Sequence, residues 1–144
     1  MKSIIVLNGP NLNLLGNREP EIYGADTLSD IEKLCMKKAL ALNIQGSFFQ
    51  SNIEGELVNE IQKSKNKQDG IILNAGAYTH TSIAIMDALI ATQVPTIEVH
   101  ISNIYHRESF RHVSYISKAT IGQICGFGIY GYSMALDAII QNNL

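Results

Sequence analysis

Apolar residues along the 144-residue chain fall into short continuous runs that alternate with stretches of helical periodicity. Continuous runs such as 2–7 and 70–73 are typical of strands covered on both faces. Recurrence of apolar residues every three or four positions is typical of amphipathic helices. The pattern predicts, in order, strand 2–7, helix 27–43, strand 44–50, helix 54–66, strand 70–73, helix 81–92, strand 95–99, strand 119–124 and helix 129–141.

Five strands alternating with helices predict an α/β fold, a flavodoxin-like three-layer sandwich with right-handed crossovers. We expect a five-stranded parallel sheet of order 2-1-3-4-5, formed by one domain over residues 1–144. In such sheets ligands bind beyond the carboxyl ends of the strands, where the strand order reverses. The polar segments 8–24, 74–80 and 100–111 follow the first, third and fourth strands. We therefore expect an active site where these three loops meet.

The helix expected at 81–92 is apolar almost all round. A surface helix shows a polar face, so this one either lies deep in the domain or contacts another subunit, which we favour in a chain of this size. Asp87 places one carboxylate in this helix and needs a partner there. It lies seven residues past His80, which predicts that both side chains stand on the same side and serve this pocket or a neighbour's.

Composition and charge narrow the possible partners. The chain is 46% apolar and 17% charged with a net charge of -2, which indicates a globular protein without a nucleic-acid or anionic-membrane partner. No apolar run reaches the ~18 residues of a membrane span, and the apolar start is too short for a signal peptide. Cys35 and Cys125 lie far apart in apolar surroundings, which predicts reduced core thiols and a cytoplasmic protein.

The arginines and histidines are unevenly distributed. The three arginines, Arg18, Arg107 and Arg111, fall in the loops after the first and fourth strands, and the four histidines lie within 80–112. Seven of the eight lysines, by contrast, occur in the first 67 residues. Because the planar guanidinium suits bidentate recognition of carboxylates, these positions indicate a site for a polar ligand, although so few residues also cluster by chance.

The loop 8–24 is longer than the roughly 2–6 residues of an ordinary strand-to-helix connection. Gly16 and Gly24 bracket Arg18 and Tyr23, so this half of the loop is expected to move as a flap. Tyr23 either packs its ring in the loop or acts as a base. A phenolate at neutral pH needs about 4 kcal/mol of stabilisation, which a guanidinium at ~4 Å supplies, and Arg18 is the expected partner.

The other two loops offer hydrogen-bonding and acid–base groups. Asn74 and His80 can bind ligand hydroxyls, or His80 can be a surface residue beside a helix cap. Glu98 and His100 alternate with Val99, so they point to the same side of their strand. A carboxylate beside an imidazole orients it and favours its protonated form, which suits a general acid, but such pairs also occur as buried structural contacts.

The sequence does not support several familiar functional motifs. The G-x-G-x-x-G at 126–131 follows the last strand, with 13 residues left and no acidic residue to hold a ribose, so it indicates close packing. Asn8 and Asn74 stand where a phospho-receiver domain needs carboxylates, and 8–11 is not the phosphate loop of a flavin protein. Neither metal-ligand spacing nor G-x-S-x-G is present.

Taken together, several motifs closely resemble the type II 3-dehydroquinate dehydratase (type II dehydroquinase) family. They are N-G-P-N-L-N-L-L-G at 8–16, R-E-P-E-I-Y-G at 18–24, N-A-G-A-Y-T-H-T-S at 74–82, E-V-H-I-S-N at 98–103 and R-E-S-F-R at 107–111. The match covers nearly the whole chain in order and spacing. It implies a flavodoxin-like dodecamer built from trimers. It also implies a hydro-lyase of the shikimate pathway of aromatic amino-acid biosynthesis, which converts 3-dehydroquinate to 3-dehydroshikimate and water through an enolate, without metal or cofactor.

The resemblance implies a role for each matching residue. Tyr23 would remove a proton from the carbon beside the ketone, with Arg18 stabilising its phenolate. Asn11 would stabilise the enolate through an ordered water. His100, oriented by Glu98, would protonate the departing C1 hydroxyl. The implied substrate-binding groups are the backbone N–H groups of Ile101 and Ser102 for the carboxylate, Asn74, His80 and Arg111 for the hydroxyls, and Asp87 from a neighbouring subunit.

The absence of lysine from the three loops supports the resemblance, whereas the role of three other residues does not follow from it. The type I enzyme uses a Schiff-base lysine on a larger barrel, and the absence of lysine from these loops agrees with the type II route. Tyr78, Tyr105 and His106 sit at positions that vary in the family, so they leave contacts at the rim open. Two other functions remain possible: a non-catalytic module that binds a small polyhydroxy acid, and a related lyase acting on another hydroxy-ketone.

Overall fold

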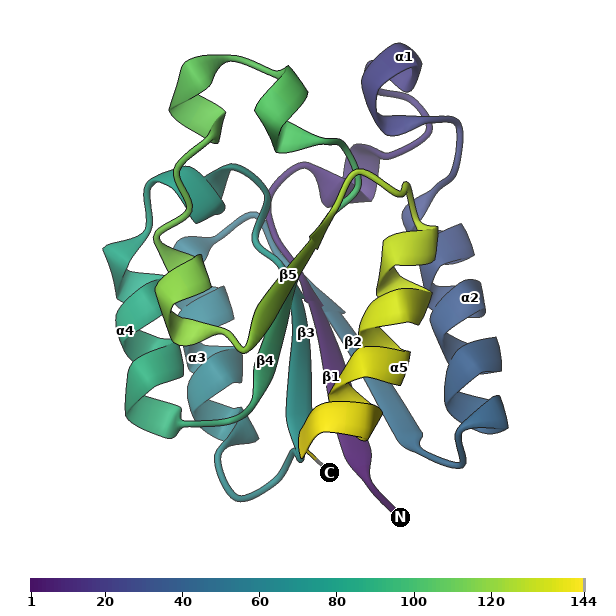
Figure 1. Ribbon diagram of the computed structural model, residues 1–144, viewed down its shortest axis with the longest axis vertical. Helices are drawn as coiled ribbons and strands as arrows, with labels where there is room; N and C mark the ends of the chain where they lie inside the picture. The colour runs from purple at the N-terminus through teal and green to yellow at the C-terminus, as the bar shows by residue number, and fades with distance from the viewer. Residues whose placement is uncertain (144) are drawn as a thin grey trace.

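The computed structural model describes residues 1–143, which form a parallel β-sheet between two layers of helices (Figure 1). The strands are β1 (Ser3–Asn8), β2 (Gln45–Gln50), β3 (Gly70–Asn74), β4 (Thr96–His100) and β5 (Gly122–Cys125). The α-helices are α1 (Pro20–Tyr23), α2 (Leu28–Ala41), α3 (Glu54–Ser64), α4 (Ile83–Thr92) and α5 (Tyr130–Asn143). Helices α2 and α5 cover one face of the sheet, and α3 and α4 cover the other.

The strand order is β2-β1-β3-β4-β5 with all neighbours parallel, which confirms the predicted fold class and topology. The order reverses between β1 and β3, where Asn8 lies opposite Asn74 at the carboxyl ends. The loops that follow β1, β3 and β4 gather at this edge of the sheet, at the top of Figure 1, and the N-terminus and the end of α5 lie at the opposite edge.

The central strands are buried on both faces because successive side chains point to opposite sides of the sheet. Ile4 and Val6 of β1 pack on the side of α2 and α5, whereas Ile5 and Leu7 pack on the side of α3 and α4. All four side chains are buried, and the burial of each stabilises the folded state by roughly 1.5–3 kcal/mol. The continuous apolar runs in the sequence therefore describe a sheet with a core on each face.

Helix α2 begins with the capping box that the sequence predicts, with aspartate in place of glutamate. The backbone N–H of Asp30 donates to the Thr27 hydroxyl at 3.2 Å, and the backbone N–H of Thr27 donates to the Asp30 carboxylate at 2.9 Å. The bond from the Thr27 backbone holds the pKa of Asp30 below its usual value. These bonds satisfy two N–H groups that would otherwise lack partners at the helix start.

Five short 3-10 segments occur where the pattern predicted loops or parts of other elements. They are η1 (Leu12–Leu14), η2 (Gly76–His80), η3 (Ile104–His106), η4 (Ser109–Arg111) and η5 (Ile116–Ala119). Because η5 includes Ala119, strand β5 begins at Gly122 and not at residue 119. Helix α4 starts at Ile83 because η2 occupies residues 76–80 and the Ser82 hydroxyl caps the helix, accepting from Ile85 N at 2.9 Å. These two predicted boundaries were therefore wrong by two or three residues.

The expected alignment of His80 with Asp87 assumed two turns of one helix, and the structure does not have that helix. His80 ends η2, and Asp87 belongs to α4, so no continuous helix relates the two side chains. Asp87 is exposed on α4, as are Ile83 and Ile90, each at 53%. The second face of α4 is thus apolar and uncovered in a single chain.

The glycine-rich segment 126–131 packs closely against the loop after β4, as its position predicted. A Cβ on Gly126, whose φ is +96°, would lie 3.1 Å from the Cβ of Asn103. A Cβ on Gly131 would lie 3.4 Å from the side chains of Ile124 and Val99. Both cysteines are free. Cys35 is buried, which raises the pKa of its thiol to about 12, and Cys125 is half-buried.

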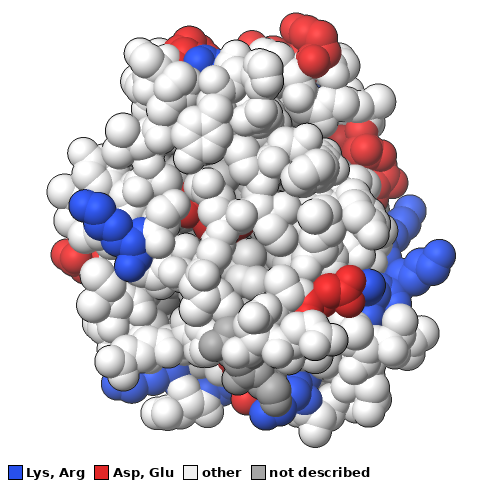
Figure 2. All heavy atoms as spheres, viewed as in Figure 1, with Lys and Arg blue, Asp and Glu red and all other residues white. Residues whose placement is uncertain are grey.

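The surface carries charges of both signs. On the face shown in Figure 2, charged side chains stand mainly toward the rim and most of the centre is uncharged. No helix within residues 1–143 is long and apolar enough to cross a membrane.

Candidate active site

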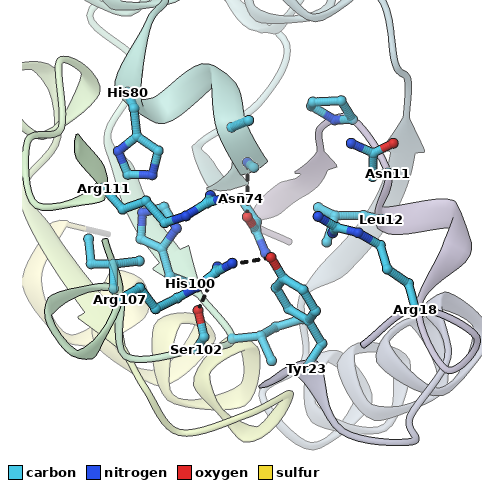
Figure 3. Close-up of a pocket in the computed structure, with 15 residues that line it drawn as sticks. Asn11, Leu12, Arg18, Tyr23, Asn74, His80, His100, Ser102, Arg107 and Arg111 are labelled. Carbon is cyan, nitrogen blue, oxygen red and sulfur yellow. Dashed lines mark hydrogen bonds between the residues drawn. The ribbon is translucent and has the colours of Figure 1, made fainter. Parts of the chain in front are cut away.

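A cavity lies at the carboxyl edge of the sheet, where the three polar loops meet (Figure 3). Nine residues singled out from the sequence line it: Asn11, Arg18, Tyr23, Asn74, His80, His100, Ile101, Ser102 and Arg111. Glu98 lies buried behind His100, and Asp87 lies on α4 outside the cavity of its own chain.

The first two loops approach each other through glycine. Gly9 N donates to the Asn74 carbonyl at 2.8 Å, and a Cβ on Gly9 would lie only 2.5 Å from the carbonyl oxygen of Ala75. No side chain fits that space, so glycine allows the loop after β1 to pack directly on the loop after β3. This contact fixes the floor of the cavity on the Asn11 side.

Tyr23 lies between two guanidinium groups. Arg107 Nη1 donates to the Tyr23 hydroxyl at 2.9 Å, and Arg18 lies over the ring with its Cζ 4.7 Å from the ring centroid. The Arg107 side chain is 13% exposed, whereas that of Arg18 is 33% exposed and also lies 3.8 Å from Glu19. The charged hydrogen bond to the hydroxyl therefore comes from Arg107, and Arg18 contacts only the ring.

Arg107 is the principal residue that reasoning from sequence missed. The expected partner of Tyr23 was Arg18, which contacts the face of the ring. The Tyr23 hydroxyl is instead held by Arg107, 84 positions away in the sequence. The sequence did place Arg107 among the three arginines of the loops. Only Arg18, however, is close to Tyr23 in the sequence, so Arg18 was taken as its partner. Arg107 also donates to the Ser102 hydroxyl at 3.4 Å, so it links the loop after β1 to the loop after β4.

His100 and Glu98 form a close buried pair. His100 Nε2 lies 2.5 Å from Glu98 Oε2, with the two residues 5% and 0% exposed. Burial works against the charge of Glu98, but its hydrogen bonds, first that to His100, hold its pKa below the usual range. The predicted same-side arrangement of these side chains on β4 is therefore present, with the imidazole against the cavity and the carboxylate behind it.

His80 is held as a neutral imidazole with a defined tautomer. Its Nδ1 lies 2.8 Å from the Val113 carbonyl, which can only accept, so Nδ1 carries the proton. Burial lowers the pKa of His80, the bond to Val113 raises it, and the nearby His100 and Arg111 charges lower it further. Its Nε2 then has a free lone pair that can accept from a ligand hydroxyl. The ring stacks on His100 with centroids 6.3 Å apart.

Asn74 is positioned by a chain of buried hydrogen bonds. Its Nδ2 donates to the Tyr132 hydroxyl at 2.9 Å, and its Oδ1 accepts from Gly76 N at 3.1 Å. The Tyr132 hydroxyl donates in turn to Asn8 Oδ1 at 2.5 Å. An amide has two N–H groups, so Asn74 has one left for a ligand. Tyr132, which the sequence did not single out, therefore sets the orientation of this side chain from α5.

Asn11 has a left-handed backbone with φ of 69°. Its N–H donates to Asn52 Oδ1 at 2.9 Å, and the Asn52 carbonyl accepts from the Tyr78 hydroxyl at 2.7 Å. The strained conformation is therefore held by a side chain from the loop after β2, with Tyr78 as its support. Neither Asn52 nor Tyr78 was predicted to contribute to the site.

Arg111 lines the other side of the cavity. Its Nε donates to Glu108 Oε1 at 3.1 Å, and its side chain is 20% exposed. This bond leaves the outer nitrogens of the guanidinium for a ligand. Ile101 and Ser102 follow β4 directly and also line the cavity.

Fold and cavity together define a class: a flavodoxin-like α/β enzyme with an acid–base site at its topological switch point. A tyrosine held by arginine and a histidine held by a buried carboxylate face one cavity, among amide and guanidinium donors suited to a small hydroxylated anion. A tyrosine and a histidine held in this way are chemically able to remove and to deliver a proton.

Comparison with known proteins places the chain within this class. The family model described as "Dehydroquinase class II" matches residues 2–140. The chain is 59% identical over 141 residues to 3-dehydroquinate dehydratase of Endomicrobium trichonymphae, which covers 98% of this chain and 99% of that one. It is 58% identical over 136 residues to the Dinoroseobacter shibae protein of the same name, covering 94% and 91% of the two chains.

Solved structures agree with this assignment. The crystal structure of type II dehydroquinase from Butyrivibrio crossotus superposes with a TM-score of 0.94 at 44% identity, covering 96% of this chain and 97% of that one. The chain belongs to the class II dehydroquinase family.

Proposed function

We propose that this protein is a type II 3-dehydroquinate dehydratase, which converts 3-dehydroquinate to 3-dehydroshikimate and water in the shikimate pathway. The observation that carries the proposal is the pairing of Tyr23 with Arg107 on one side of a cavity that has the His100–Glu98 pair on another. Family membership and the names of the relatives support it.

In the proposed mechanism, Tyr23 acts as the base. Its phenolate removes a proton from the carbon beside the ketone, and the guanidinium of Arg107 stabilises the phenolate by a charged hydrogen bond, with Arg18 over the ring. The electrons of the broken C–H bond form an enolate. Asn11 is exposed toward the cavity and stabilises the enolate oxygen, through a water molecule.

The second half of the reaction requires an acid. The imidazolium of His100 gives its proton to the C1 hydroxyl, the C–O bond breaks, and the enolate electrons form the conjugated double bond as water leaves. Glu98 orients the ring and stabilises its charge through the 2.5 Å contact at Nε2. Tyr23 ends the reaction protonated and His100 neutral, so one proton passes back through solvent before the next turnover.

Substrate recognition in this proposal uses neutral and cationic donors. The backbone N–H groups of Ile101 and Ser102 receive the carboxylate. The hydroxyls contact Asn74, whose second N–H is free, and Nε2 of His80, whose lone pair accepts. Arg111, oriented by Glu108, completes this side of the cavity. A cavity of this kind selects a hydroxylated ring with one carboxylate.

We further propose an assembly of trimers into a dodecamer, in which Asp87 of each chain reaches the cavity of a neighbour. Asp87 is exposed and outside its own cavity, and the surrounding α4 face exposes Ile83 and Ile90, a surface that a partner subunit would cover. We expect the chain to form one domain and to work in the cytoplasm, in keeping with two free cysteines.

The direct test is turnover of 3-dehydroquinate by the purified protein. The product contains a conjugated enone, so absorbance in the ultraviolet should rise with time. A module that only binds a polyhydroxy acid would retain the ligand without any absorbance change, and this outcome at micromolar protein would refute the dehydratase. A related lyase would act on another hydroxy-ketone in a substrate panel and leave 3-dehydroquinate unchanged.

A further inference from the structure

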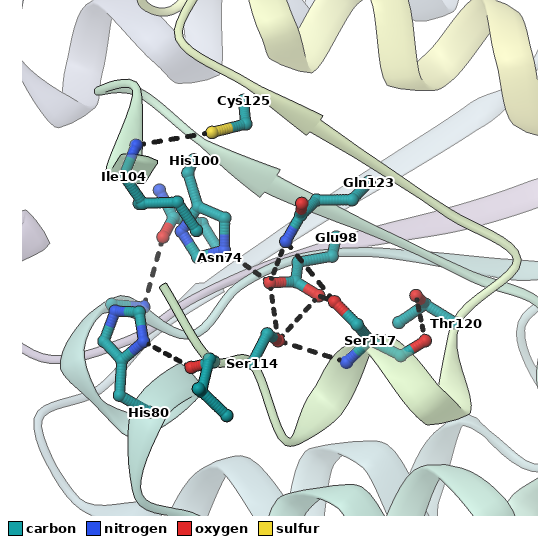
Figure 4. A network of polar contacts seen from close by, with 12 residues as sticks. Asn74, His80, Glu98, His100, Ile104, Ser114, Ser117, Thr120, Gln123 and Cys125 are labelled. Carbon is teal, nitrogen blue, oxygen red and sulfur yellow. Dashed lines mark hydrogen bonds and ion pairs between the residues drawn. The ribbon is translucent and has the colours of Figure 1, made fainter. Parts of the chain in front are cut away.

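Glu98 receives more hydrogen bonds than its pairing with His100 requires (Figure 4). Besides the contact with His100, Oε1 accepts from Ser117 Oγ at 2.7 Å, and Oε2 accepts from Gln123 Nε2 at 2.9 Å. The hydroxyl of Ser114 lies between the two oxygens, at 3.1 and 2.9 Å. A carboxylate has about four acceptor sites, so these donors occupy essentially all of them.

The direction of these bonds specifies the charge of Glu98. The amide nitrogen of Gln123 can only donate, and Gln123 Nε2 also donates to Ser117 Oγ at 3.3 Å, which turns the Ser117 hydrogen toward Glu98. Ser117 N donates to Ser114 Oγ at 3.1 Å, so the same holds for Ser114. Each neighbour other than His100 therefore presents hydrogen to the carboxylate. An ionised Glu98 fits this arrangement, and a protonated one does not.

The donors come from parts of the chain that lie outside the cavity. Ser114 precedes η5, Ser117 lies within it, and Gln123 lies on β5, whereas His100 faces the cavity from β4. The Val113 carbonyl, next to Ser114, holds His80. One segment, 113–117, thus supports both imidazoles of the site from behind.

We propose that Ser117 and Gln123, assisted by Ser114, are positioning residues that keep Glu98 ionised and so keep the proton of the pair on His100, ready for the leaving hydroxyl. The inference rests on the proposed function, in which His100 is the acid. Without these donors Glu98 takes up a proton at higher pH, and a protonated Glu98 no longer accepts from His100 Nε2, so the imidazolium loses the partner that orients it and stabilises its charge.

Few other charges bear on Glu98. His100 contacts it directly, and His80, on the same side of the sheet, is close enough for its titration to respond to Glu98 and to Arg111. On the elements that pack over this face, Asp87 of α4 and Lys118 of η5 are exposed. His100 therefore contributes most to the stabilisation of the carboxylate, and the hydrogen bonds from Ser117 and Gln123 come next.

The test removes one donor at a time, in Ser117→Ala and Gln123→Met. Infrared difference spectra, with Glu98→Gln as the blank, report the carbonyl stretch of a protonated Glu98 and need no turnover. Because the donors lower the pKa of Glu98, their loss makes it take up a proton at higher pH. We expect a shift of about one pH unit for each lost bond to the charged group, with the acid limb of kcat/KM moving by the same amount.

Two matched variants separate this role from a merely structural one. Thr120→Val removes a hydroxyl of the same segment that donates to the Ser117 carbonyl at 3.1 Å and not to Glu98, so the acid limb should stay at the wild-type pH. Ser117→Thr keeps the hydroxyl, so its infrared titration and its acid limb should stay close to those of the wild type.

The outcomes are distinct. An unshifted infrared titration in Ser117→Ala and Gln123→Met overturns the inference, and so does a shifted titration with an unmoved acid limb. A kcat/KM that falls equally at all pH values, with the acid limb at the wild-type pH, also contradicts the inference, because such a result would come from a general loosening of the loop. Failure of the wild type to turn over 3-dehydroquinate would refute the proposed function instead, while the infrared titration still decides whether these donors hold the charge of Glu98.

Discussion

At the scale of single residues, the proposed base and the proposed acid each have a charged partner of their own. Arg107 donates to the Tyr23 hydroxyl. Glu98 contacts Nε2 of His100. In the proposed mechanism the guanidinium stabilises the phenolate and the carboxylate stabilises the imidazolium, so that one cavity holds both a base and an acid.

Arg107 and Arg18 should contribute unequally, because only Arg107 donates to the Tyr23 hydroxyl. In Arg107→Gln we expect kcat near pH 7 to fall about 10- to 150-fold, the equivalent of one charged hydrogen bond. The rate of the variant relative to that of the wild type should rise as the pH approaches 10, where the phenolate forms unaided. Steady-state rates between pH 6 and 10 measure this effect.

Arg18→Gln is the matched control for Arg107→Gln, since it makes the same chemical change over the ring face. Its loss of kcat should be the smaller of the two. A larger loss in Arg18→Gln, or a wild-type rate in Arg107→Gln, would show that the hydroxyl contact is not the one that matters.

At the scale of elements, α5 is connected to the carboxyl ends of β1 and β3 by the hydroxyl of Tyr132. Burial raises the pKa of this phenol, which stays neutral and acts through its hydrogen bonds to Asn8 and Asn74. Both asparagines are almost fully buried. The helix therefore fixes the end of the sheet at which the cavity lies.

Tyr132→Phe should destabilise the protein by about 1–3 kcal/mol, because two buried amides lose a partner. It should also raise KM, since Asn74 is no longer oriented. Denaturant unfolding at fixed protein concentration gives the stability, and the ultraviolet assay gives KM. Tyr130→Phe, at an exposed tyrosine of the same helix, should change stability by less than about 0.5 kcal/mol. Equal effects of the two substitutions would contradict the role of Tyr132.

The elements themselves were largely predictable from sequence. Buried runs and helical periodicity located every strand and all the long helices, because those patterns reflect burial on the faces of the sheet. The 3-10 segments η2 and η5 shifted the starts of α4 and β5, since single turns leave no period to detect. Motifs and loop positions brought the candidate residues to one cavity.

What sequence reasoning missed are contacts between distant segments. Arg107 reaches Tyr23 across 84 positions, and Asn52 holds Asn11 across 41. Gln123 approaches Glu98 only because β5 pairs with β4. Such partners depend on register and packing, which no local pattern specifies.

At the scale of the whole molecule, the shared site that we propose would combine two chains. The apolar second face of α4 is exposed, and Asp87 stands on it, away from the cavity of its own chain. If a neighbour uses this carboxylate, each active site combines loops of one subunit with α4 of another.

Subunit complementation tests the shared site. Tyr23→Phe and Asp87→Ala should each be inactive alone. In oligomers that mix the two, some sites combine an intact Tyr23 from one chain with an intact Asp87 from the next. At equal mixing these are about a quarter of all sites, so about a quarter of wild-type activity should return. Mass spectrometry should show that the oligomers are mixed. If no activity returns in them, either Tyr23 and Asp87 of one chain belong to the same active site, or Asp87 belongs to no active site.

The central claim is that Tyr23 is the base of a dehydratase, and Tyr23→Phe tests it most directly. The substitution removes one oxygen and leaves the ring between Arg18 and Arg107. We expect kcat for 3-dehydroquinate to fall by at least about 10³-fold, while the dissociation constant measured by calorimetry stays within about twofold of wild type. A variant that retains kcat within about tenfold of wild type would contradict the account.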